Sequence, residues 1–232
     1  PRASSRTCPA PGRCQTCGMT LELALTLVSG VAWSVVYVAA IRIGFRDRTY
    51  AMPFGALALN LAWEFLYTYD GFTSPWGAQT WVNLVWACLD VVILASYLRF
   101  GRRDLPSFVT RPMFGVWVVG MLGVAFAVQG LFIAEFGWSL KAAEYSAFLQ
   151  NLLMSVLFVQ FYVLRGGPRG QSLVIAVAKW LGTLAPTILL GVLPGNVFVI
   201  GIGALCSVVD LAYIALLLWG RRGPSAGSMR TV

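Results

Sequence analysis

Long blocks of apolar residues, separated by short polar breaks, run through the whole 232-residue chain. A soluble protein instead scatters its apolar residues at a period of 2 or 3.6. A helix needs roughly 20 residues to cross a hydrocarbon core about 30 Å thick. Seven blocks reach this length, near residues 21–41, 51–69, 79–98, 113–133, 145–164, 172–192 and 197–219. The pattern predicts an all-α integral membrane protein built as a seven-transmembrane-helix bundle.

The composition agrees with this prediction. The chain is 58% hydrophobic and only 11% charged, whereas soluble domains carry about 25% charged residues. The breaks between the blocks are short, so we expect one bundle with no soluble domain attached. This gives a disordered N-terminal tail over residues 1–19, the bundle over 20–220 and a basic cytoplasmic tail over 221–232.

The basic residues favour one side of the predicted bundle. The loops after the second, fourth and sixth spans hold only Lys141, and the N-terminal tail adds Arg2, Arg6 and Arg13. Twelve arginines follow the first, third, fifth and seventh spans: Arg42, Arg46, Arg48, Arg99, Arg102, Arg103, Arg111, Arg165, Arg169, Arg221, Arg222 and Arg230. Because loops rich in Lys and Arg stay in the cytoplasm, we expect the N-terminus outside and the C-terminus inside. The net charge of +8 then reflects topology and contact with the lipid bilayer, and no nucleic-acid partner is expected.

No metal or cofactor is expected from the sequence. Cys14 and Cys17 have the spacing of a redox or zinc half-site, but the chain has no second pair and no histidine to complete a zinc site. We interpret Cys88 and Cys206 as small apolar packing residues. The sequence leaves the oligomeric state open.

Three of the nine carboxylates in the chain lie deep inside predicted spans: Glu64, Asp90 and Asp210. Each is about 12 to 14 residues into its span, close to the bilayer centre at roughly 1.5 Å per residue. An acid at that depth costs about 2.5–3.5 kcal/mol on insertion scales and normally marks a function. The only basic residue inside a span is Lys179, which we expect to leave these acids largely unneutralised. Desolvation and mutual repulsion favour their protonated form, and a buried carboxylic acid is a proton donor.

Polar and aromatic residues surround these acids at helical spacing. Asn60 is one turn before Glu64, on the same helix face. An Asn or Tyr beside an acid can stabilise its conjugate base, and aromatic faces can stabilise a cation. The candidate substrate-binding or cation-stabilising residues are Asn60, Trp63, Tyr67, Asn83, Trp86, Glu144, Asn151 and Tyr213.

An apolar pocket with a strong acid, aromatic walls and no metal ligands suits one reaction type. That reaction is protonation of an alkene or epoxide followed by a carbocation cascade, from which water is excluded. The chain has no DDxxD sequence for a magnesium-diphosphate site, so ionisation of a diphosphate is not expected.

The stretch MPFGALALNLAWEFLY resembles the second-span signature of the membrane-integrated terpene cyclases of fungal meroterpenoid and indole-diterpene pathways, which have bacterial relatives. The resemblance implies seven transmembrane helices, with an acid in an N-x-x-W-E motif and an aspartate in the last span both essential. Here these are Glu64, with Asn60 and Trp63, and Asp210 in CSVVDLAY. It also implies a lipophilic prenylated substrate, such as a prenylated indole. The Ala, Gly, Val and Arg-rich composition favours a bacterial cell membrane.

Other classes of membrane protein are less consistent with the sequence. A small proton-coupled transporter would also place Glu and Asp at mid-membrane, but the paired Pro-Gln motifs of small sugar transporters are missing. A retinal protein needs a Schiff-base lysine in its last span, and none is there. A purely structural subunit would not need three buried acids. The transporter remains the alternative to a cyclase.

Overall fold

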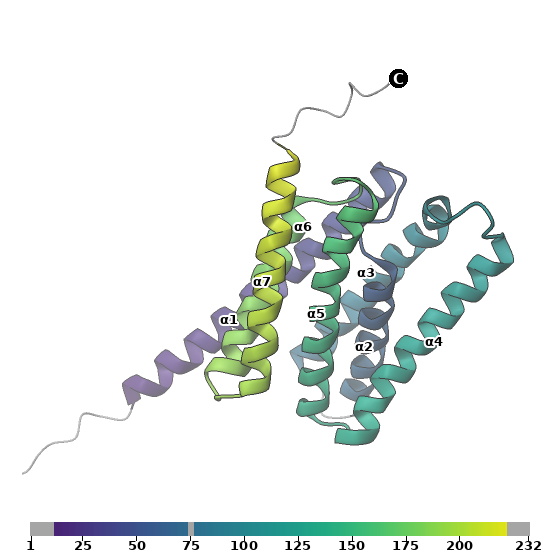
Figure 1. Ribbon diagram of the computed structural model, residues 1–232. Coiled ribbons are helices and arrows are strands. Elements are labelled where there is room, and N and C mark those ends of the chain that lie inside the picture. The colour runs from purple at the N-terminus through teal and green to yellow at the C-terminus, as the bar shows by residue number, and fades with distance from the viewer. Residues whose placement is uncertain (1–11, 74–76, 222–232) are drawn as a thin grey trace, which may run out of the picture.

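A computed structural model describes residues 12–73 and 77–221, with side chains described from residue 20 onward. The fold is all-α, and helices occur at all seven predicted positions (Figure 1). They are α1 (Gly12–Arg46), α2 (Phe54–Thr73), α3 (Ala78–Phe100), α4 (Arg111–Phe136), α5 (Leu140–Leu164), α6 (Leu173–Thr187) and α7 (Val197–Gly220). A short 3-10 turn, η1 (Gly101–Asp104), follows α3, and a π-helical turn, η2 (Ile188–Val192), follows α6.

The prediction of a multi-span membrane protein is confirmed, but the predicted number of spans is not. Within the described residues, six helices are long and apolar enough to cross a membrane, one fewer than the sequence predicted. The seventh helix, α2, has 20 residues, but Asn60, Glu64 and Asp70 lower its mean hydropathy. The direction in which the chain crosses the membrane stays a prediction.

The division of the chain into a tail, a bundle and a second tail also stays a prediction. Helix α1 begins at Gly12, inside the segment assigned to the N-terminal tail. The Cys14 and Cys17 side chains lie outside the described part of the chain, as do residues 222–232 of the basic tail.

Helix α2 packs against α3, α4 and α5, and in the view of Figure 1 it lies between α5 and α4. Helix α1 contacts α3 on one side and α6 on the other, and α7 contacts α5 and α6. Ten of the 20 residues of α2 are buried, among them Asn60 and Glu64. Two of the polar residues that lower its hydropathy, Asn60 and Glu64, therefore face protein rather than lipid.

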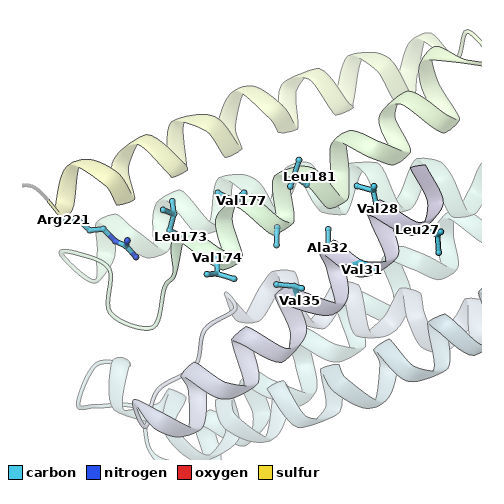
Figure 2. Close-up of a pocket in the computed structure, with 11 residues that line it drawn as sticks. Leu27, Val28, Val31, Ala32, Val35, Leu173, Val174, Val177, Leu181 and Arg221 are labelled. Atoms are coloured by element: carbon cyan, nitrogen blue, oxygen red, sulfur yellow. The ribbon is translucent and has the colours of Figure 1, made fainter. Parts of the chain in front are cut away.

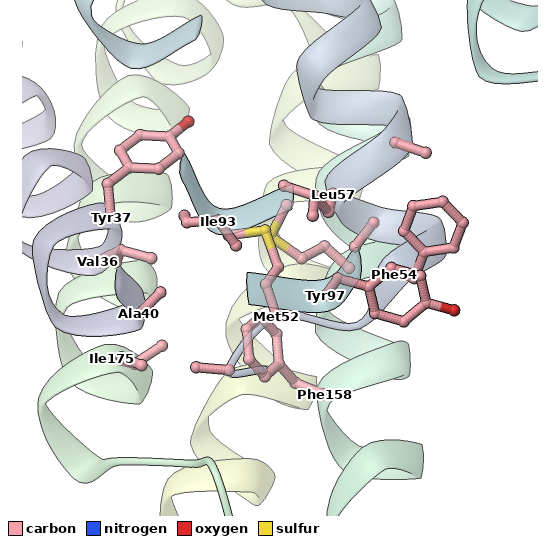
Figure 3. Packing of buried hydrophobic residues seen from close by; sticks show 14 of the residues in the cluster. Val36, Tyr37, Ala40, Met52, Phe54, Leu57, Ile93, Tyr97, Phe158 and Ile175 are labelled. Atoms are coloured by element: carbon pink, nitrogen blue, oxygen red, sulfur yellow. The ribbon is translucent and has the colours of Figure 1, made fainter. Parts of the chain in front are cut away.

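The core around α2 is apolar toward the end where α1 finishes. Met52 and Leu57 are fully buried against Ile93 of α3 and Phe158 of α5 (Figure 3). Tyr37 of α1 belongs to the same cluster. Its ring is in the apolar core, and its hydroxyl group reaches the polar site described below.

Helices α1 and α6 approach closely at Gly182. A Cβ atom on Gly182 would lie 2.9 Å from the Trp33 ring. The Gly182 carbonyl oxygen accepts hydrogen bonds from Ser29 Oγ at 2.9 Å and Trp33 Nε1 at 3.2 Å. Small residues that let two backbones come together are typical of helix contacts in membranes, and this contact fixes α6 beside α1.

Candidate functional site

Two of the three predicted acids, Glu64 and Asp90, meet between α1, α2 and α3. Both are buried, with exposed fractions of 1% and 0%. Asn60, one helical turn before Glu64, bridges them: its Nδ2 lies 2.9 Å from Glu64 Oε1 and 2.9 Å from Asp90 Oδ2. The predicted pairing of Asn60 with Glu64 on one helix face is confirmed. We call Tyr37, Asn60, Glu64 and Asp90 the acid cluster.

Tyr37 completes the acid cluster from α1. Its hydroxyl group donates to Glu64 Oε1 and accepts from Asn60 Nδ2, the latter at 2.6 Å. Glu64 Oε1 therefore accepts hydrogen bonds from two groups, whereas Glu64 Oε2 is buried and has no hydrogen-bond partner among the described residues. Asp90 Oδ1 is likewise buried and unpartnered in that part of the chain. The two oxygens of the Glu64 carboxyl group therefore differ in their hydrogen bonding.

A second layer of amides supports the acid cluster. Gln150 of α5 donates through Nε2 to Asn60 Oδ1 at 3.3 Å and accepts at Oε1 from Gln129 Nε2 of α4 at 2.6 Å. Neither Tyr37 nor these glutamines was among the predicted site residues. Each is a polar side chain in an otherwise apolar helix, which is the signal that could have marked it.

Asp210, the third acid, lies in a different cluster. Its two carboxylate oxygens accept from Lys179 Nζ at 2.9 and 3.0 Å, and the same nitrogen donates to Ser155 Oγ at 2.6 Å. Lys179 and Asp210 are each 1% exposed. The expectation that Lys179 would leave Asp210 unneutralised was wrong, because the helices α6 and α7 are antiparallel. Lys179 lies 13 residues before the end of η2, and Asp210 lies 13 residues after the start of α7, so the two side chains reach the same depth.

Helix α5 contacts both clusters, through Gln150 and Ser155. Gln150 belongs to the layer behind Asn60, while the next residue, Asn151, donates to Thr183 Oγ1 at 2.7 Å. Thr183 in turn donates to the Lys179 carbonyl oxygen at 2.9 Å. Adjacent residues of one helix therefore support the two acid sites.

Of the predicted aromatic residues, Trp86 lies nearest the acid cluster. Its ring centroid is 5.9 Å from that of Tyr37, and its Nε1 donates to Ser34 Oγ at 3.2 Å. Trp33 also lies beside Tyr37, and the centroids of the two rings are 6.2 Å apart. Trp33 was not predicted as a site residue.

The other aromatic candidates point elsewhere. Trp63 donates through Nε1 to the Ala143 carbonyl oxygen at 3.1 Å, and its ring centroid is 4.8 Å from that of Tyr67. Tyr213 donates to Gln171 Oε1 at 2.7 Å, and its ring is 5.5 Å from that of Phe158. Their hydrogen bonds therefore join them to parts of the bundle away from the acids.

Two polar candidates also lie apart from the acid cluster. Asn83 is buried and accepts from Gln79 Nε2 at 2.7 Å. Glu144 is half-buried, one turn into α5. Among the described residues, neither forms a hydrogen bond or ion pair with the acids, and their roles stay predictions.

An apolar groove of about 780 Å³ runs between α1 and α6 (Figure 2). It is lined by Leu27, Val28, Val31, Ala32, Val35, Leu173, Val174, Val177, Ala178 and Leu181, with Arg221 at one end. None of the three acids lines it. The groove is on the outer face of the helix pair, where a hydrocarbon chain would fit.

The fold and the buried polar clusters define a class: an all-α integral membrane protein with several membrane-spanning helices and acids enclosed between them. The chain belongs to the Pyr4-like transmembrane terpene cyclases, whose family model matches residues 10–222. The predicted family is thereby confirmed, and the protein is a membrane terpene cyclase of secondary metabolism. The transporter alternative is set aside.

Several fungal proteins are similar to the chain. The terpene cyclase pyr4 of Aspergillus fumigatus is 29% identical over 84% of this chain and 85% of its own length. The terpene cyclase macJ of Penicillium terrestre is 30% identical over 69% of this chain and 62% of its own length. The asnovolin H synthase nvfL of Aspergillus novofumigatus is 27% identical, over 69% and 65% respectively. No solved structure matches the chain. The fungal relatives lend no support to the expected bacterial membrane.

Proposed function

We propose that this cyclase starts its reaction by protonating the prenyl chain of its substrate with the carboxylic acid of Glu64. The observation that supports this is the pairing of two buried carboxyl groups, Glu64 and Asp90, across Asn60. Neither has an ion-pair partner among the described residues. Two desolvated carboxyl groups without a cation favour a state in which at least one is protonated. Such a pair stores an acidic proton inside the membrane.

The difference between the two Glu64 oxygens suggests how the proton leaves. Tyr37 and Asn60 donate to Oε1, and these hydrogen bonds strengthen as negative charge develops there. The proton to be transferred sits on Oε2, which has no partner among the described residues. The O–H bond breaks, a C–H bond forms on an alkene or an O–H bond on an epoxide, and the positive charge passes to the prenyl chain. The cation later loses a proton, so the net reaction is an isomerisation.

Asp210 has a separate role in this proposal. Its carboxylate is ion-paired with Lys179 and is therefore a poor proton donor. A carboxylate held at mid-membrane can instead stabilise a nearby cation or accept its proton at the end of the cascade. The family resemblance implies that Asp210 is essential, and a role in stabilising or deprotonating the cation is consistent with that expectation.

We further propose that all seven helices cross the membrane, with α2 shielded by α3, α4 and α5. The arginine-rich ends of α1, α3, α5 and α7 would then lie in the cytoplasm. The substrate we expect is a prenylated indole or another meroterpenoid precursor. The family and the name of the relative pyr4 support a terpenoid substrate.

The test is a reaction in deuterated water. Membranes holding the protein receive a prenylated indole, with or without a terminal epoxide, and products are read by mass spectrometry and NMR. An alkene-protonating enzyme adds one deuterium to carbon at the protonated end of the chain. With an epoxide the deuterium enters a hydroxyl group and exchanges, while a cyclic alcohol accumulates. A cyclised product from the alkene substrate without carbon-bound deuterium would overturn proton initiation on that substrate.

A further inference from the structure

A cavity of about 560 Å³ lies at the end of the bundle where α1 and α3 finish, far along both helices from the acid cluster. It is lined by Phe45, Arg48, Arg99, Phe100 and Arg103. Three cationic side chains and two aromatic rings thus surround one space. No step of the cyclisation proposed above uses these residues.

The charge of this cavity is not balanced by the protein. The carboxylates at this end of the described bundle are both bound by other arginines: Asp47 by Arg46, and Asp104 by Arg165 and Arg169. The hydrogen bond from Arg46 lowers the pKa of Asp47 below its ordinary value, so this carboxylate is ionised and is already paired with Arg46. The three arginines of the cavity form no ion pair with any described residue.

Local geometry holds these arginines around the space. Arg48 has a φ of 50°, in the left-handed region that Gly usually fills after a helix end. The hydrogen bond from Thr49 N to the Gly44 carbonyl oxygen, at 2.9 Å, closes this turn. A bulky residue in this conformation costs free energy and often marks a functional position. The guanidinium carbons of Arg99 and Arg103 lie 5.7 and 5.6 Å from the Phe100 ring centroid, which restricts both side chains.

We propose that this cavity binds a phosphate group, either the headgroup of an anionic phospholipid or a free phosphate anion. A guanidinium group presents planar donors that match phosphate oxygens. Phe45 is 43% exposed beside the arginines and offers an apolar surface of the kind that the glycerol and upper acyl region of a lipid contacts. Anionic lipid headgroups attract basic clusters at the end of membrane spans. The site is distinct from the cyclase chemistry and does not depend on it.

The experiment measures binding to the full chain in detergent micelles. The probes are short-chain phosphatidic acid, short-chain phosphatidylcholine, inorganic phosphate and inorganic diphosphate. The test variant is Arg48→Gln/Arg99→Gln/Arg103→Gln. The matched control is Arg42→Gln/Arg102→Gln/Arg111→Gln, which removes three exposed arginines at the same end that do not line the cavity. The control corrects for the general attraction of any anion to a basic surface.

We expect phosphatidic acid to bind more tightly than phosphatidylcholine, and the test variant to weaken this binding by about tenfold more than the control. Tight binding of inorganic phosphate or diphosphate, lost in the same variant, identifies the free anion as the ligand instead. If no probe binds the unmodified chain, or both variants weaken binding equally, the proposal is wrong. Should the test variant fail to fold, Arg99→Gln against Arg42→Gln makes the same comparison with single substitutions.

Discussion

The two buried acid sites of this protein differ in what accompanies the carboxyl groups. In the acid cluster, Asn60 bonds to both Glu64 and Asp90, Tyr37 bonds to Glu64, and both partners are neutral. In the second site, Asp210 faces the Nζ atom of Lys179 at 2.9 and 3.0 Å. A carboxyl group without a cation favours its protonated form, and one beside a cation favours the ionised form. The same residue type can therefore serve as an acid in one place and as a fixed anion in the other.

The two sites should also differ in how a substitution affects stability and activity. A buried ion pair that loses one partner leaves an uncompensated charge, which is strongly destabilising. A neutral carboxylic acid replaced by an amide of the same shape leaves no such charge. Substitutions in the acid cluster should thus lower activity with little change in stability, whereas single substitutions in the ion pair should lower both.

The largest effect is expected for Glu64→Gln. The amide keeps the size of the side chain and can still accept from Tyr37 and Asn60, but it has no acidic proton. General acid catalysis contributes about 10²- to 10⁴-fold, so turnover of a prenylated substrate should fall by at least that range. The rate of cyclised product formation, measured in membranes with matched protein levels, checks this. Glu135→Gln, which changes an exposed acid in the last turn of α4, is the control, and equal rates for both variants would remove Glu64 from the donor role.

The next effect is on stability. Lys179→Met should lower the free energy of unfolding by about 3–5 kcal/mol, because it leaves the Asp210 carboxylate buried without its partner. The double variant Lys179→Met/Asp210→Leu removes both charges and should recover most of the loss. Thermal unfolding in detergent measures both variants.

Activity of the double variant then tests the role of Asp210. If the carboxylate takes part in the cascade, the double variant regains stability and stays inactive, which is the outcome we expect. Recovery of turnover together with stability would mean that the pair only holds α6 against α7. A Lys179→Met protein as stable as the unmodified chain would contradict the buried ion pair itself.

A smaller effect is expected for Tyr37→Phe. The substitution keeps the ring in the core and removes the hydroxyl group that donates to Glu64 Oε1. Hydrogen bonds to a charged group contribute about 1.5–3 kcal/mol, so turnover should fall by about 10- to 100-fold. Tyr213→Phe removes a buried hydroxyl that bonds to Gln171 instead, and should change the rate little. Similar losses in the two variants would mean that the Tyr37 hydroxyl acts only through general stability.

Much of the architecture could be predicted because the membrane imposes it. Spans of about 20 apolar residues are required by the thickness of the bilayer, and helices occur at each of the seven predicted positions. The count of spans was less secure for a physical reason. Helix α2 buries its polar face against α3, α4 and α5. A low mean hydropathy is expected both for a membrane helix that is shielded by other helices and for a helix outside the membrane, so hydropathy alone does not distinguish the two.

Contacts within one helix could also be predicted, and contacts between helices could not. The spacing of Asn60 and Glu64 fixes their contact, because residues four apart share a helix face. The meeting of Tyr37 with Glu64 depends on how α1 is rotated against α2, which no spacing within either span determines. The pairing of Lys179 with Asp210 was missed for another reason. The depth of each residue was counted from the start of its own span. The two side chains are in fact equally far along the chain from the turn that joins η2 to α7.

The smallest effect concerns where the cation travels, which depends on the aromatic residues that lie beside the acid cluster. Trp86 lies against Tyr37 and therefore beside the proton donor. Trp219, in the last turn of α7, is 74% exposed. If the cascade begins at Glu64, the indole of Trp86 stabilises the first cation by about 2 kcal/mol. Trp86→Leu should then shift the partition between full cyclisation and early deprotonation by up to about 30-fold.

The measurement for this last prediction is the product profile by mass spectrometry, with the total rate recorded separately. New partly cyclised products should appear for Trp86→Leu and not for Trp219→Leu. If the product profile of Trp86→Leu is unchanged, whatever the total rate, the cation forms on another side of the acid cluster. The half-buried Trp63, which lies on α2 beside Glu64 but bonds to α5, is then the next residue to replace. A product change there would place the prenyl chain between α2 and α5 rather than between α1 and α3.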